Sequence, residues 1–112
     1  MITINLDKPR NISYPLGSIR AGKRQFSCGI LSMLQPNMMG PDVVVDLLWM
    51  GLIHEDPALT PGALDTIIWE WLQKPGNSFN ILETTVLEAL QVDKVLNFAG
   101  VAEKNPKQKK IT

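Results

Sequence analysis

The sequence predicts an α+β domain that is mostly α, with an N-terminal β-hairpin packed on about four helices and a disordered basic C-terminal tail. Apolar and polar residues alternate over residues 2–16, which is typical of strands. From residue 18 onward apolar residues recur at helical spacing, interrupted by segments rich in Pro and Gly. Because 112 residues suit one domain, we expect a single globular domain over 1–102 and a disordered tail over 103–112.

The predicted hairpin has two short strands around a polar turn at 7–11. The apolar residues that define them are Ile2, Ile4 and Leu6 in the first strand and Ile12, Tyr14 and Leu16 in the second. A two-stranded ribbon is only marginally stable in water. We therefore expect its apolar face to lie on helices, or its open edge to pair with another chain.

A first helix is predicted from Ser18 to about Gln35. Glycine costs roughly 1 kcal/mol relative to alanine inside a helix, so we expect a break near Gly29. The polar side of this helix carries three cations, Arg20, Lys23 and Arg24.

The second predicted helix, about 41–54, is the most apolar part of the chain. Pro41 suits its first position, where a missing N–H has no cost. The helix is apolar on nearly every side over residues 47–53. It therefore belongs in the middle of the molecule or beneath a partner.

Two further helices follow. Thr60 is suited to cap a helix that begins at Pro61 and ends before the Lys74-Pro75-Gly76-Asn77 stop. The last helix is predicted at about 79–98, with Leu96 on its buried side. Trp69 lies off the apolar stripe of its helix, where a large aromatic side chain often marks a protein contact.

The formal net charge is zero, but the charges are segregated. Residues 1–24 and the tail from 104 are basic. Residues 25–103 contain ten acidic residues and only two basic ones, Lys74 and Lys94. These acids would repel a duplex, so a solvated basic helix face is preferred over a nucleic-acid site. The sequence shows no run of about 18 apolar residues and no signal-peptide pattern. We expect a cytoplasmic protein without membrane association.

Candidate catalytic groups are few. His54-Glu55-Asp56 contains the only histidine, and its three side chains point in different directions at a helix end. Cys28 is the only cysteine, which excludes an intramolecular disulfide and a cysteine cluster and fits a small core residue. The sequence therefore predicts neither an enzyme nor a metal or cofactor site.

A protein-binding role is the remaining interpretation of the excess apolar residues. The candidate contact residues are Met38, Met39, Trp49, Met50, Leu52 and Trp69. Methionine repacks easily against varied partners, which suits an adaptable apolar groove. The alternative is that these residues close the protein's own core.

Two segments carry a resemblance to a known family. The opening Leu6-Asp7-Lys8-Pro9-Arg10, followed by Ile12-Ser13-Tyr14 and Ile19-Arg20-Ala21, is one of them. The other is the run from Leu47 through Trp49-Met50-Gly51-Leu52-Ile53-His54-Glu55-Asp56-Pro57 to Pro61. In residue identity, order and spacing, over about residues 4–72, these segments resemble those of the small tail assembly chaperones of long-tailed, siphovirus-like phages and prophages. The cations of the first helix depart from the acids that family members often carry there.

The resemblance implies a non-enzymatic factor of virion morphogenesis in the host bacterial cytoplasm, absent from the mature virion. Such a factor binds and solubilises the tape measure protein and helps recruit tail tube protein. In that family a programmed frameshift often gives a longer form, and the Lys107-Gln108-Lys109-Lys110 end suits an A-rich slippery site.

Two alternative functions stay open at this point. The first alternative is a structural tail or head-tail connector component retained in the virion. The second is a small nucleic-acid-binding regulator. Self-association into a homo-oligomer through the hairpin edge or the apolar helix is compatible with each function.

Overall fold

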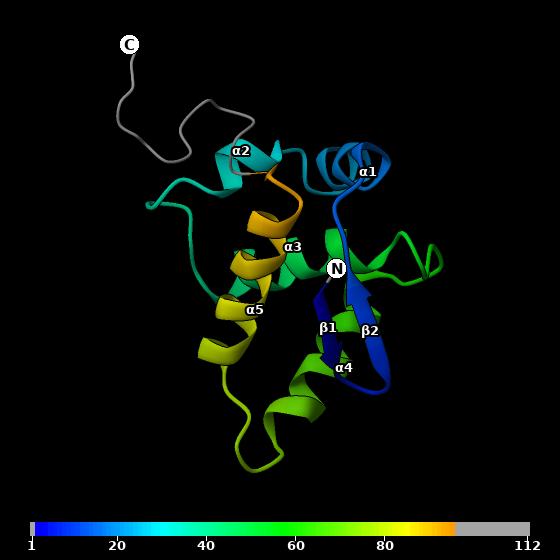
Figure 1. Ribbon diagram of the computed structural model, residues 1–112, viewed down its shortest axis with the longest axis vertical. Coiled ribbons are helices and arrows are strands. Elements are labelled where there is room, and N and C mark those ends of the chain that lie inside the picture. Colours follow the sequence, from blue (N-terminus) through cyan, green and yellow to red (C-terminus); the bar gives the residue numbers. More distant parts are fainter. Residues whose placement is uncertain (1, 96–112) are drawn as a thin grey trace.

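A computed structural model gives the architecture and describes residues 2–95 (Figure 1). Within these residues a two-stranded antiparallel hairpin is followed by five helices, which confirms the predicted α+β, mostly α class. The elements are β1 (Ile2–Asn5), β2 (Pro9–Ile12), α1 (Leu16–Phe26), α2 (Ile30–Met33), α3 (Pro41–Leu52), α4 (Pro61–Leu72) and α5 (Phe79–Val92). The predicted tail at 103–112, and the last part of the predicted domain at 96–102, lie outside the described residues.

The hairpin begins where predicted, but its second strand comes earlier. Ile2 pairs with Ile12 and Asn5 with Pro9, so the turn is shorter than the polar run suggests. The prediction that the second strand reaches Leu16 is wrong. The N–H groups of Ser18 and Ile19 donate to the Pro15 carbonyl and start α1, leaving Leu16 on the surface with 63% of its area exposed.

The first predicted helix breaks as expected near Gly29. α1 ends at Phe26, and the next residue, Ser27, has a φ of 55° in the left-handed region. Gly29 then has an extended conformation and precedes the single short turn of α2. The chain is therefore redirected before it reaches the loop that leads into α3.

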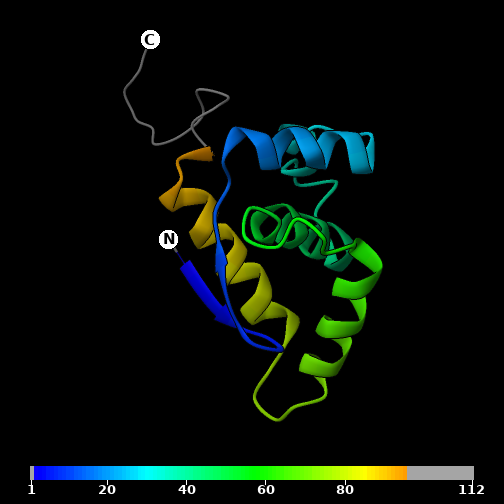
Figure 2. The same ribbon diagram turned by 90° about the vertical axis from the view of Figure 1, so that its right-hand side faces the viewer.

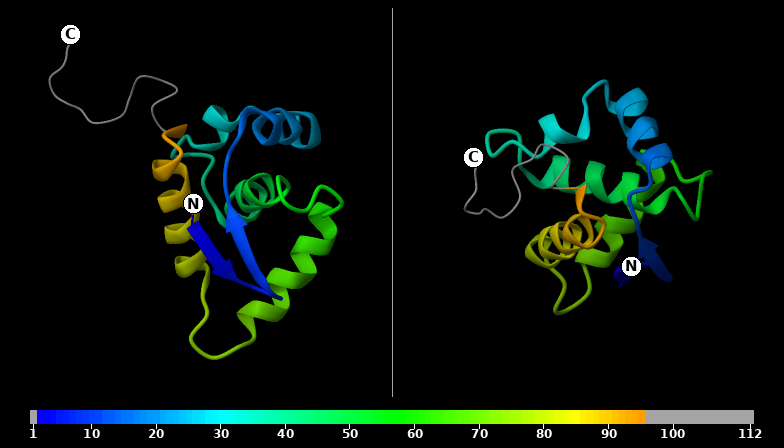
Figure 3. Two further views of the ribbon diagram at one scale, coloured as in Figure 1. Left: turned by 45° about the vertical axis from the view of Figure 1, so that its right-hand side comes forward. Right: turned by 45° about the horizontal axis from the view of Figure 1, so that its top comes forward.

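α3 lies in the middle of the molecule, between α1 on one side and the hairpin, α4 and α5 on the others (Figures 2 and 3). Leu47, Leu48 and Met50 have no exposed surface. Of the two places considered for this helix, the interior of the molecule is the one observed.

The hairpin is joined to α3 by close backbone contact. The Ser13 N–H donates to the Gly51 carbonyl at 2.9 Å, and the Tyr14 hydroxyl donates to the Leu47 carbonyl at 2.8 Å. A Cβ at Gly51 would lie 2.5 Å from Cγ2 of Ile12. Glycine is needed here because any larger residue would push the strand away from the helix.

The elbow between α3 and α4 is fixed from both ends. Trp49 donates its indole N–H to the Leu59 carbonyl at 2.8 Å, which holds the elbow against the helix that precedes it. The Thr60 hydroxyl accepts the Ala63 N–H at 3.1 Å, and α4 starts at Pro61, so the predicted cap is confirmed.

α5 starts at Phe79 as predicted but ends at Val92, before the predicted limit of 98. Its last turn meets the other end of the chain. The Asp93 carboxylate accepts the Tyr14 N–H at 2.6 Å and the Ser13 hydroxyl at 3.1 Å. Leu96, expected on the buried side of this helix, lies outside the described residues.

Candidate protein-binding surface

The fold brings together the two sequence segments that carry the family resemblance. Arg10, from β2, forms a fork with the Asp7 carboxylate, with Nε–Oδ1 and Nη2–Oδ2 distances of 2.8 and 2.9 Å. Its Nη1 lies 3.2 Å from Oδ2 of Asp56 in the elbow. Next to it, Asn11 donates to the Glu55 carboxylate at 2.9 Å, and Nε2 of His54 donates to the Asn11 carbonyl at 2.9 Å.

These contacts identify a structural joint between the hairpin and the elbow. Arg10 is only 7% exposed and has a carboxylate on two sides of its guanidinium group. Hydrogen bonding to Arg10 lowers the pKa of the Asp7 carboxyl, and the same pair raises the pKa of Arg10. Charges that are satisfied by each other hold segments in place and have little capacity left for a reaction or a ligand.

A hollow of about 460 Å³ lies over this joint, lined by Lys8, Pro9, Arg10, Asn11, Leu52, Glu55 and Asp56. Three of its charged lining residues already have partners: Arg10 pairs with Asp56, and Glu55 accepts from Asn11. Residues 2–95 contain no group of three or more His, Cys, Asp or Glu side chains placed to hold a metal ion. Since most of the charged groups that line this hollow are already paired with one another or with neighbours, we base the functional proposal on the apolar groove described next.

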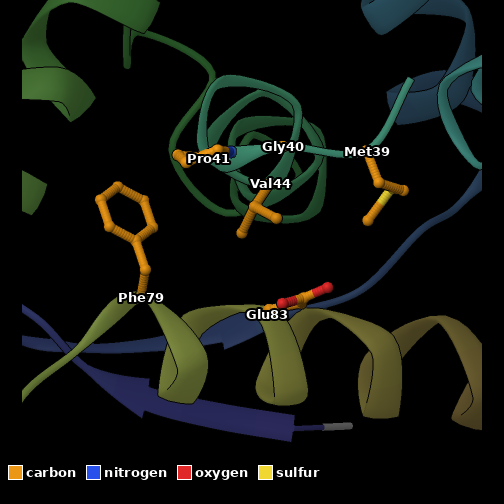
Figure 4. Close-up of a pocket in the computed structure, with 6 residues that line it drawn as sticks. All are labelled: Met39, Gly40, Pro41, Val44, Phe79 and Glu83. Carbon is orange, nitrogen blue, oxygen red and sulfur yellow. The ribbon is translucent and has the colours of Figure 1, made fainter. Parts of the chain in front are cut away.

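An apolar groove lies between the start of α3 and the first turns of α5. It is lined by Met39, Gly40, Pro41, Val44, Phe79 and Glu83. In Figure 4 Val44 points from α3 toward α5, Phe79 points from α5 toward Pro41, and Met39 closes one end. We call this site the α3–α5 groove. Met38, which precedes Met39 in the sequence, is 44% exposed.

The size of the α3–α5 groove favours side chains of a partner protein over a cofactor. Its volume is about 230 Å³, whereas pockets for small molecules and cofactors usually hold roughly 300–1,000 Å³. Glu83 is the only charged residue among those that line it. Such a groove suits one or two apolar side chains projected by a helix or an extended segment.

Three of the six predicted contact residues are buried, although Leu52 also lines the hollow over the joint. Trp49, Met50 and Leu52 are 7%, 0% and 1% exposed. Trp49 packs edge-on against Phe26 with ring centroids 5.4 Å apart, and Met50 fills the space over Gly22. Their assignment to a binding surface is therefore corrected: the excess apolar residues of α3 fill the core, because neighbours surround that helix on nearly every side.

The other three predicted contact residues are accessible, in two separate places. Met39 lines the α3–α5 groove, and the exposed Met38 precedes it in the sequence. Trp69 lies on the outer face of α4 and is 66% exposed. The structure thus divides the predicted surface into a groove and an isolated exposed tryptophan.

Sequence reasoning missed Phe79 and Glu83 as groove residues. Phe79 was expected on the buried side of its helix, and it is only partly buried because it faces the opening. Glu83 was one acid among many in the middle of the chain. Their spacing of four residues placed them on one strip of α5, but nothing local indicated that α3 would lie opposite.

None of the helices in residues 2–95 has the length and apolar character needed to cross a bilayer. Comparison with protein-family models, with curated proteins and with solved structures finds no match to this chain. The groove and the joined motif segments therefore carry the functional proposal.

Proposed function

We propose that this protein is a non-enzymatic chaperone of phage tail assembly that binds an apolar helical segment of the tape measure protein and keeps it soluble. The α3–α5 groove is the observation that supports this most directly. Met39, Val44 and Phe79 form an apolar opening beside the core of the described residues. A chaperone for an unassembled helical protein requires such a surface.

The joint between the two motif segments supports the same proposal. The residues that resemble the tail assembly chaperones are the ones that fix the elbow to the hairpin, through Arg10, Asp7 and Asp56. They set the angle between α3 and α4 and the position of the hairpin beside α5. The motif residues thus maintain the arrangement of the hairpin and helices. This is consistent with a protein that functions through a binding surface.

On this proposal the chaperone acts in the host bacterial cytoplasm and leaves before the virion is complete. Recruitment of tail tube protein requires a second contact, and the exposed Trp69 on α4 is a suitable anchor for it. A longer form made by programmed frameshifting would extend the chain beyond Thr112.

Co-expression with the tape measure protein of the same phage tests the groove. The groove variant carries Met39→Ser and Phe79→Ser, and the matched control carries Leu16→Ser and Val92→Ser, which are 63% and 49% exposed outside the groove. Wild type and control should raise the soluble fraction of the tape measure protein, whereas the groove variant should not. Circular dichroism of each variant verifies its fold.

A client that stays equally insoluble with and without the wild-type chain would contradict the proposal. Mass spectrometry of purified virions separates it from its main alternative. A tail or connector component is retained in the particle, whereas a chaperone is absent from it.

A further inference from the structure

The strip of α5 that supplies Phe79 and Glu83 to the groove continues beyond it to Leu87, so one acidic residue lies between two apolar ones. Phe79, Glu83 and Leu87 are spaced by four residues, so they follow one another along the same strip of α5. Figure 4 shows both Phe79 and Glu83 on this strip, with Glu83 beneath Val44 and Phe79 to one side. Leu87, one turn further on, is 36% exposed. The strip therefore reads apolar, acidic, apolar over about 12 Å of helix.

The facing wall supplies no counter-charge for Glu83. Met39, Pro41 and Val44 are apolar, and Gly40 has no side chain. Within residues 2–95 the ion pairs closer than 4 Å are those that Arg10 makes with Asp7 and Asp56. Among the described residues Glu83 is exposed and takes part in no ion pair. A partner that covers the groove removes water from this carboxylate, which is unfavourable unless the partner brings a cation.

We propose that the segment captured by the α3–α5 groove is an amphipathic helix with a lysine or arginine between two large apolar anchors on its inward face. This inference rests on the proposed chaperone function and names the chemistry of the client. The anchors lie seven residues apart, about 10 Å along the helix, and pack near Phe79 and Leu87. The cation lies between them and pairs with Glu83.

The same geometry makes the groove selective. A helix with a carboxylate at the central position places two like charges together as water is removed, which opposes binding. A wholly apolar helix leaves Glu83 covered and unpaired, so it too binds less well than the cationic one. Glu83 also fixes the register of the client, because only one position along the helix satisfies it.

The test uses two synthetic helical peptides of about 20 residues, long enough to form helices. Both carry leucine anchors seven residues apart, and they differ only in a central lysine or glutamate. Fluorescence anisotropy measures their affinity for the full chain. The wild type should bind the lysine peptide about three- to tenfold more tightly than the glutamate peptide, and this ratio should shrink at high salt.

Charge reversal at the groove provides the matched comparison. Glu83→Lys should invert the preference, so that the glutamate peptide binds more tightly. Glu88→Lys makes the same change at an exposed residue on another face of α5 and should leave the wild-type ratio unchanged. Both variants alter exposed side chains, so the fold should persist, as circular dichroism would verify.

Three results would overturn the inference, and they differ in what else they affect. Equal binding of both peptides by wild type removes the role of Glu83 but leaves the groove as an apolar binding site. No binding of either peptide removes the groove, and with it the main support for the chaperone function. Binding that weakens as protein concentration rises, with a dimer in sedimentation, means that a second copy covers the groove.

Discussion

The joint between the hairpin and the elbow depends on an ion pair of Arg10 with a residue far away in the sequence. The sequence places this cation in a polar run that was expected to form a turn. In the fold it lies on β2, is 7% exposed, and bridges Asp7 to Asp56, which is 46 positions away. Nothing near Arg10 indicates this burial, because the carboxylate that completes it arrives with the elbow. The motif segments were recognised from sequence, but their contact could not be derived from it.

Tyr14, the only tyrosine of the chain, reports on the packing of the hairpin. Burial raises the pKa of Tyr14 well above its usual range, and the nearby Asp93 carboxylate raises it further. A group whose folded pKa exceeds its unfolded value stabilises the fold below the unfolded pKa, here about 10, and this contribution is lost as pH rises above that value. We predict that Tyr14 remains protonated in the folded protein at about pH 11.

An alkaline titration followed by tyrosinate absorbance and by tryptophan fluorescence checks this prediction. The two signals should change together, because Tyr14 ionises only when the protein unfolds. The urea-unfolded chain serves as control and should titrate near pH 10. Tyrosinate absorbance that rises near pH 10 while the fluorescence stays native would show that the hydroxyl is accessible.

Individual elements could be predicted where their signals are local. The starts of α3 and α4 were predicted correctly, since each has a proline at its first position and Thr60 caps the second. The break at Gly29 was also correct. The second strand was placed too late because alternation of Ile12, Tyr14 and Leu16 continues through a residue that starts a helix. The α3–α5 groove was not predicted, since it exists only between elements packed by the whole fold.

The contact between β2 and α3 leads to a prediction about a matched pair of glycines. Gly51→Ala should destabilise the protein by about 1–3 kcal/mol, because the new methyl group would overlap Ile12 and approach the Tyr14 ring. Gly62→Ala, in α4 with open space around it, should instead be stabilising by up to about 1 kcal/mol. Urea unfolding of both variants measures the difference. Equal effects at the two positions would mean that β2 does not lie against α3 as described.

At the scale of the molecule, core and binding surface are carried by different residues. Leu52 is enclosed, whereas Met38, which precedes the groove residue Met39, is 44% exposed. Leu52→Ala should reduce the free energy of unfolding by about 2–5 kcal/mol. Met38→Ser should change it by no more than about 0.5 kcal/mol yet weaken capture of the lysine peptide.

Urea unfolding and the anisotropy assay, applied to the same two variants, check this separation. Leu16→Ser is a suitable control, since that side chain is exposed away from the groove and should affect neither measurement. The opposite outcome would be a Leu52→Ala variant that has normal stability but no longer binds the lysine peptide. That result would mean that α3 forms a binding surface, as its apolar sequence first suggested.

The bond between Asp93 and the Ser13–Tyr14 segment also has a consequence for biosynthesis. Its partners are separated by about 80 residues. At ribosomal rates of roughly 5–20 residues per second, Asp93 is added about 4 to 16 s after Tyr14. During that interval β2 can already pack against α3, but β1 has no α5 to lie against. The first strand to be synthesised therefore meets its partner helix only when the last helix of the described residues has been made.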